Sequence, residues 1–116
     1  VIVAASGVIV TNAHVVDAGD EFRVVLADRR EFPANLVLKD DRTDLAVLQI
    51  DAEGEPLPTL SYADTSQVQV GDLVLAIGNP FGVGQTVTSG IVSALARTDV
   101  GVSDYSSFIQ TDASIN

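Results

Sequence analysis

The first residue whose type could do chemistry is His14, the single histidine of this 116-residue chain. It lies in the segment Thr11–Val16, directly after the apolar run Val8–Val10. An imidazole titrates near neutral pH, so His14 is the candidate side chain for a general base. The chain has no cysteine, which excludes thiol catalysis and zinc sites that use cysteine. The alternative for His14 is a structural role, in which the ring packs at or caps the end of a strand.

The second candidate is Asp44, at the start of the apolar segment Leu45–Ile50. A carboxylate beside apolar sequence needs hydrogen-bond donors. On local evidence Asp44 could cap the strand or pair with Arg42. It could also accept a hydrogen bond from one nitrogen of a histidine ring and leave the other nitrogen free as a base. Histidine, then aspartate, with a serine later in the chain, is the order found in serine proteases of the chymotrypsin type.

Two other motifs do not indicate a ligand. The acidic residues Asp40, Asp41 and Asp44 are too close together for an EF-hand, which spreads its ligands over about 12 residues. The glycine-rich segment 78–84 lacks the lysine of a P-loop, and a β-rich segment follows it where a dinucleotide site needs a helix. We therefore expect a structural turn at 78–84, no metal and no cofactor.

Composition narrows the classes of partner. The net charge of −10 argues against nucleic acid and anionic membranes, because both require a basic surface. No apolar run approaches the roughly 20 residues that cross a bilayer. The N-terminal segment Val1–Ala5 is too short and uncharged for a signal peptide.

The elements that must position His14 and Asp44 are expected to be strands, because short β-branched runs alternate with turn residues. Leu45–Ile50 is almost continuously apolar, which predicts burial on both faces, and Leu73–Ile77 is predicted to be another buried strand. Gly90 predicts a bulge or a close backbone contact. A polar, proline-bearing stretch begins at Asp51, and we place the internal boundary between about 51 and 70. The expected strands are 1–4, 8–10, 22–26, 31–38, 45–50, 73–77, 86–96 and 108–110, with a hairpin turn at 5–7.

Several motifs together resemble the HtrA (Deg) family of trypsin-like serine proteases. Thr11–Val16 resembles the catalytic-histidine motif of that family, and Asp41–Leu48 resembles its catalytic-aspartate motif. The segments that match its second barrel, in order, are 70–72, 76–82, 86–93 and 108–116. The resemblance covers essentially the whole chain.

The resemblance implies an all-β fold, the trypsin/chymotrypsin-like double six-stranded β-barrel, truncated at both ends. Residues 1–55 would form the N-terminal barrel that carries His14 and Asp44. Residues 56–70 would connect it to an incomplete C-terminal barrel, 71–116. No PDZ domain is expected in this chain.

The implied function is a serine endopeptidase that degrades unfolded or misfolded proteins in the bacterial periplasm or cell envelope. In the family, a Pro-Gly-Asn-Ser-Gly-Gly segment that holds the nucleophilic serine follows directly after the position of Asn116. We therefore expect the 116 residues alone to be inactive. The alternative is a protease-like peptide-binding or chaperone module without catalysis, and the residues encoded after Asn116 would distinguish the two.

The resemblance also implies roles for residues near the C-terminal end. Ser114 and Ile115 would line the primary substrate pocket, which would then lack a carboxylate and favour small aliphatic side chains. Arg97, Asp99 and Tyr105 lie in 97–107, the position of the family's regulatory sensor loop, although a merely flexible hairpin connection is the alternative. The implied partners are unfolded protein or peptide substrates, and the full-length parent would form a homotrimer or a higher oligomer.

Overall fold

The computed structural model describes residues 1–17, 21–79, 84–95 and 108–115. The chain divides into two compact units, Val1–Ala63 and Asp64–Asn116. Each unit is described by itself below. None of the helices within the described residues is both long and apolar enough to cross a membrane.

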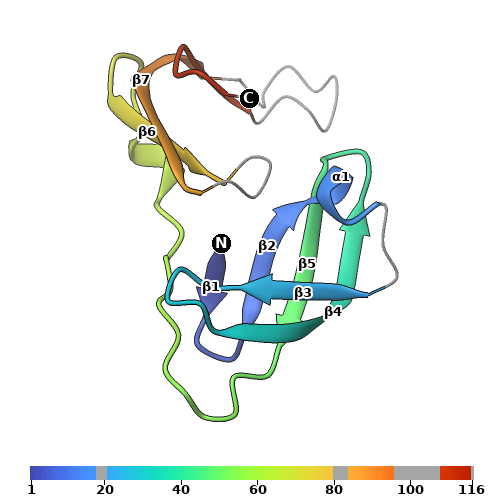
Figure 1. The fold of residues 1–116 in the computed structure, drawn as a ribbon. Helices are drawn as coiled ribbons and strands as arrows, with labels where there is room; N and C mark the ends of the chain where they lie inside the picture. The colour runs from blue at the N-terminus through green and yellow to red at the C-terminus, as the bar shows by residue number, and fades with distance from the viewer. Residues whose placement is uncertain (18–20, 80–83, 96–107, 116) are drawn as a thin grey trace. The chain divides into compact units, whose positions relative to one another are not determined.

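The first unit is a five-stranded antiparallel sheet in the order β1-β2-β5-β4-β3 (Figure 1). Its strands are β1 (Ile2–Ala4), β2 (Val8–Asn12), β3 (Phe22–Val25), β4 (Glu31–Asp40) and β5 (Leu45–Ile50). A single helical turn, α1 (Ala13–Val16), follows β2 without a break. Strands β1 and β3 are the edges of the sheet in the described residues, so the sheet is open there.

The turn between β1 and β2 is the hairpin that the sequence predicts. The Gly7 N–H donates to the Ala4 carbonyl at 3.0 Å, and Gly7 has a φ of 96°, a conformation that glycine adopts at little cost. A Cβ on Gly7 would also collide with the backbone carbonyl of Ile50 on β5. Position 7 therefore requires glycine both for its backbone angle and for the close approach of β5.

The core of the first unit forms on one face of this sheet. The strand β5 alternates, with Ala46, Leu48 and Ile50 buried, while Leu45 is 46% exposed. The expectation that this segment is buried on both faces is therefore wrong, because side chains alternate across a strand and only one set meets the core. The buried core residues are Ile9, Val16, Ala34, Ala46, Leu48 and Ile50.

The start of the predicted connector is attached to the first unit. Leu57 packs against the core, and the Leu60 N–H donates to the Ile2 carbonyl at 2.9 Å. The Arg30 guanidinium donates to the Pro56 carbonyl at 3.0 Å and to Glu55 at 3.3 Å. Residues 55–60 thus follow the surface of the sheet instead of leaving it.

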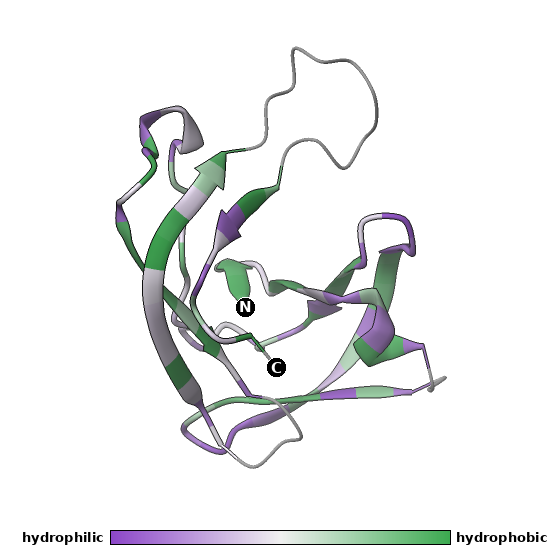
Figure 2. Ribbon diagram, turned by 90° about the horizontal axis from the view of Figure 1, so that it is seen from above, coloured by the Kyte–Doolittle hydropathy of each residue, from purple (hydrophilic) through white to green (hydrophobic). Residues whose placement is uncertain are grey.

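The second unit contains a three-stranded antiparallel sheet in the order β6-β7-β8. Its strands are β6 (Leu73–Gly78), β7 (Thr86–Leu95) and β8 (Ile109–Thr111), and a short 3₁₀ turn, Thr65–Gln67, precedes them. The long strand β7 shows hydrophobic and neutral segments in alternation (Figure 2). The all-β class and the low helix content that the sequence predicts are confirmed in the described residues.

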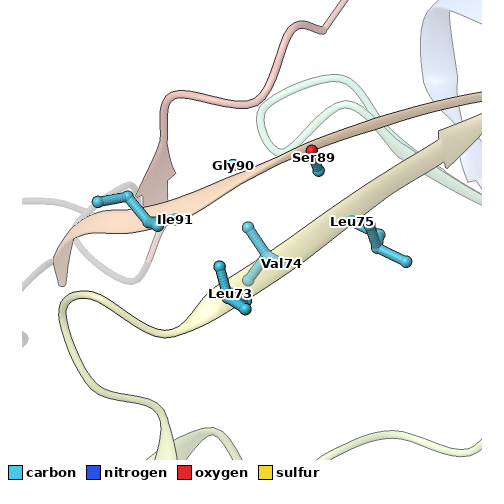
Figure 3. Close-up of a pocket in the computed structure, with 6 residues that line it drawn as sticks. All are labelled: Leu73, Val74, Leu75, Ser89, Gly90 and Ile91. Atoms are coloured by element: carbon cyan, nitrogen blue, oxygen red, sulfur yellow. The ribbon is translucent and has the colours of Figure 1, made fainter.

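The strand β6 is less buried than its sequence predicts. Leu73, Leu75 and Ile77 are 88%, 65% and 59% exposed, so the expectation that this strand is buried is wrong. These three side chains share one face of the strand. A pocket of about 360 Å³ lies over the paired strands β6 and β7. It is lined by the six residues drawn in Figure 3, Leu73, Val74, Leu75, Ser89, Gly90 and Ile91.

Candidate active site

Strand pairing brings His14 and Asp44 together although they are 30 residues apart in sequence. Asn12, the last residue of β2, is paired with Leu45, the first residue of β5. The helical turn α1 therefore begins beside the turn that joins β4 to β5 (Figure 1). Ala13 and Val16 are buried and anchor α1, while the His14 side chain is 69% exposed.

The His14 ring and the Asp44 carboxylate are in direct contact. His14 Nδ1 lies 2.6 Å from Asp44 Oδ2, and the His14 backbone N–H donates to Asp44 Oδ1 at 2.9 Å. An ionised carboxylate can only accept, so Nδ1 carries the proton of the neutral ring. The lone pair then lies on Nε2, which makes no hydrogen bond to any residue in the described part of the chain. In this arrangement Asp44 holds one ring nitrogen, and the other nitrogen could accept a proton.

Asp44 is held through its backbone as well as its side chain. Its φ of 58° is in the left-handed region, which aspartate tolerates better than most residues. The Asp44 carbonyl accepts from the Ala13 N–H at 3.0 Å and from Asn12 Nδ2 at 3.0 Å. Three consecutive residues therefore donate to Asp44. Sequence reasoning did not single out Asn12, although an asparagine just before a helical turn is a recognisable signal.

The hydrogen bonds from His14 also change the acidity of Asp44. The pKa of the Asp44 carboxyl lies below its usual range, first because the His14 backbone N–H donates to it and second because of the bond to the His14 ring. Asp44 is therefore ionised throughout the neutral range, as a residue that stabilises an imidazolium must be.

The lowered pKa of Asp44 predicts a pH dependence of stability. A carboxyl with a lower pKa in the folded state stabilises the fold above its unfolded pKa of about 3.9, and this contribution disappears as pH falls through the folded value. We expect the Tm difference between wild type and Asp44→Asn to shrink as pH falls from about 5 to below about 4. Thermal unfolding of both proteins at several pH values in that range measures this Tm difference. A difference that widens on acidification would contradict the prediction.

An ion-pair cluster attaches the end of α1 to the sheet. The Lys39 ammonium, on β4, forms an ion pair with Asp17, the C-cap residue that follows α1, and lies 3.5 Å from Asp41. These side chains are partly or largely exposed, so each pair contributes little to the free energy of unfolding. Lys39 on β4 thus contacts one residue that follows His14 in the chain, Asp17, and one that precedes Asp44, Asp41.

The predicted pocket residues lie in the second unit. The Ser114 carbonyl accepts from the Thr88 hydroxyl at 2.6 Å, and Ile115 is 74% exposed. The close approach of the Ala113 backbone to β7 requires glycine at position 90, because a Cβ there would lie 2.5 Å from the Ala113 backbone nitrogen. The close backbone contact predicted at Gly90 is therefore present, while the shift in register along β7 comes later, between Val92 and Ala94.

Two further predictions fall outside the residues that the structure describes. Arg97, Asp99 and Tyr105, the expected regulatory residues, lie in the segment 96–107, which is not described. Most of the predicted glycine turn, 80–83, is likewise not described. These remain expectations from the sequence.

Comparison with known proteins identifies the family to which this chain belongs. The family model described as the trypsin-like peptidase domain matches residues 1–116. The chain belongs to this family. A trypsin-like peptidase domain has an all-β fold, which agrees with the sheets described above.

The relatives of this trypsin-like peptidase domain confirm the resemblance to the HtrA (Deg) proteins. It is 52% identical over 116 residues to the periplasmic serine endoprotease DegP of Salmonella typhimurium, covering 100% of this chain and 24% of the relative. It is 49% identical over 117 residues to a probable periplasmic serine protease do/HhoA-like of Haemophilus influenzae, covering 100% of this chain and 25% of the relative. The chain thus spans about a quarter of the length of these relatives.

Solved structures support the same assignment. The trypsin-like peptidase domain superimposes on an HtrA-type protease, AlgW with decapeptide, with a TM-score of 0.85 and 51% sequence identity. The match covers 100% of this chain and 35% of that one. The fold is therefore trypsin-like.

Proposed function

We propose that these residues are part of a serine endopeptidase of the HtrA (Deg) type, which degrades unfolded or misfolded proteins in the bacterial periplasm or cell envelope. The observation that supports this most directly is the 2.6 Å contact between His14 Nδ1 and Asp44 Oδ2, in a side chain that is 69% exposed. The names of the relatives, which are periplasmic serine endoproteases, support the reaction and the compartment.

In the proposed mechanism, His14 Nε2 removes the proton from a serine hydroxyl as that oxygen attacks a peptide carbonyl. His14 then returns the proton to the departing amine. Asp44 keeps the ring in the required tautomer and stabilises the imidazolium that forms between the two steps. The nucleophilic serine is supplied by the longer protein, after residue 116.

Ser114 and Ile115 are proposed to line the primary substrate pocket. Thr88 holds the Ser114 carbonyl, and the Ile115 side chain is exposed and apolar. A pocket with this wall and no carboxylate would leave a Lys or Arg substrate side chain with an unpaired charge, which is costly. Small aliphatic side chains such as Val and Ala are therefore the proposed substrate residues.

The proposed architecture is the double six-stranded barrel of trypsin-like proteases. The five-stranded sheet would be the N-terminal barrel, residues 1–55, and the strands β6, β7 and β8 would belong to the C-terminal barrel, with 56–70 as the connector. We further propose a homotrimer or a higher oligomer for the full-length protein, with Arg97, Asp99 and Tyr105 in a regulatory loop.

The proposed function is tested on the longer protein that contains residues 1–116. It is incubated with a reduced, unfolded protein and with the same protein in its native state, and separately with a fluorophosphonate, which labels nucleophilic serines. We expect selective cleavage of the unfolded protein, after Val or Ala, and one labelled serine. Binding of the unfolded protein without cleavage and without labelling would support the non-catalytic binding module and refute the endopeptidase.

A further inference from the structure

Asn12 occupies the N-cap position of α1 but does not act as a cap. Its φ of −92° and ψ of 146° are those of an N-cap, yet its side chain makes no capping hydrogen bond. Asparagine is among the best N-cap residues, because its side-chain oxygen accepts from the N–H of the second or third helical residue. At α1 that donor, the His14 N–H, is taken instead by Asp44 Oδ1 at 2.9 Å. Asp44, and not Asn12, therefore makes the capping hydrogen bond at the start of α1.

The Asn12 side chain is used for a different hydrogen bond. Its Nδ2 donates to the Asp44 backbone carbonyl at 3.0 Å. The orientation of the amide group follows from chemistry, since a carbonyl oxygen can only accept. The neighbouring Ala13 N–H donates to the same carbonyl, also at 3.0 Å.

These contacts restrain Asp44 on both sides of its Cα atom. The carbonyl is held by Asn12 and Ala13, and the carboxylate is held by the backbone and the ring of His14. Asp44 adopts a left-handed φ of 58°, a conformation that persists where the surroundings fix it. The direction of the carboxylate depends on the direction of this peptide group.

We propose that Asn12 is a positioning residue for the His14–Asp44 pair: its amide fixes the Asp44 peptide group, and through it the carboxylate that orients the His14 ring. The catalytic consequence rests on the proposed function, whereas the effect on the geometry of the pair does not. The competing role, a helix cap, makes a different prediction for the same substitutions.

The discriminating variants are Asn12→Asp and Asn12→Ala. Aspartate has the shape of asparagine and caps helices equally well, but its carboxylate cannot donate to the Asp44 carbonyl. A helix cap would therefore tolerate Asn12→Asp and be harmed by Asn12→Ala. A positioning residue would be harmed by both. Asn12 is exposed, so both variants are expected to fold, and thermal melting checks this.

The first measurement uses the longer protein and a peptide substrate. We expect both variants to lower kcat about 10- to 100-fold, because a small displacement of a catalytic group has effects of this size, with KM changed less than about 3-fold. The matched control is Asn35→Asp on β4, which makes the same change in charge on an exposed strand position beside Gln49. It should retain the wild-type rate.

The second measurement does not depend on catalysis. The proton on His14 Nδ1 gives a downfield NMR resonance when it is held in a short hydrogen bond to a carboxylate, and it is assigned by its loss in His14→Gln. We expect this resonance to move upfield or broaden in both Asn12 variants, and to stay unchanged in Asn35→Asp.

The outcomes separate this inference from the proposed function. A wild-type rate and an unchanged Nδ1 resonance in Asn12→Asp would overturn the positioning role while leaving the endopeptidase intact. If the wild-type protein cleaves nothing, the proposed function fails, and the resonance alone decides whether Asn12 positions the pair. Loss confined to Asn12→Ala would overturn the positioning role in favour of a helix cap.

Discussion

Replacing His14 by alanine in the longer protein should lower kcat for peptide hydrolysis by about 10⁶-fold, the size of effect seen when a triad histidine is removed from a serine protease. In the proposed mechanism, Nε2 of the His14 ring is the base, and the contact with Asp44 keeps it free to accept a proton. Without it, the serine hydroxyl has no acceptor for its proton during attack, and the departing amine has no donor.

The control for His14→Ala is Val15→Ala on the same helical turn. Val15 is 62% exposed, so its truncation removes little packing and should leave kcat within about 2-fold of wild type. Initial rates on a chromogenic peptide measure both variants, and thermal melting shows whether each is folded. Cleavage by His14→Ala at more than about a tenth of the wild-type rate would remove His14 from the mechanism.

The second large effect is expected for Asp44→Asn, which should lower kcat about 10⁴-fold. The new amide can donate to His14 Nδ1, and a ring that accepts at Nδ1 carries its proton on Nε2. With a proton on Nε2, this nitrogen cannot accept another from the serine hydroxyl, even if the geometry of the pair is kept. The loss is smaller than for His14→Ala because the imidazole itself remains.

The control for Asp44→Asn is Asp41→Asn, in the same turn between β4 and β5. The Asp41 side chain is 76% exposed and pairs only loosely with Lys39, at 3.5 Å, yet the change in charge is the same. It should keep kcat within a few-fold of wild type. Because residues that act as a unit are not additive, the double variant His14→Ala with Asp44→Asn should be no slower than His14→Ala alone. Equal losses in Asp41→Asn and Asp44→Asn would show a general electrostatic effect instead.

The positions of the strands could be predicted from the sequence, whereas their burial could not. The positions of the strands follow from local pattern, because β-branched runs and turn residues act over a few neighbours. The segments predicted at 8–10, 45–50 and 86–96 are present with small changes at their ends. The burial predicted for 45–50 and 73–77 was wrong, because an apolar run does not say which of its faces meets the core.

The sequence alone was enough to identify one histidine, and one aspartate beside an apolar strand, as the candidate catalytic residues. Only the tertiary structure decided how they meet. The pairing of Asn12 with Leu45 places α1 beside Asp44, and the left-handed backbone of Asp44 then lets its carboxylate cap that turn while Asn12 holds its carbonyl. Each of these contacts joins residues about 30 positions apart, so no local pattern encodes them: they exist only once the register of β2 and β5 is set.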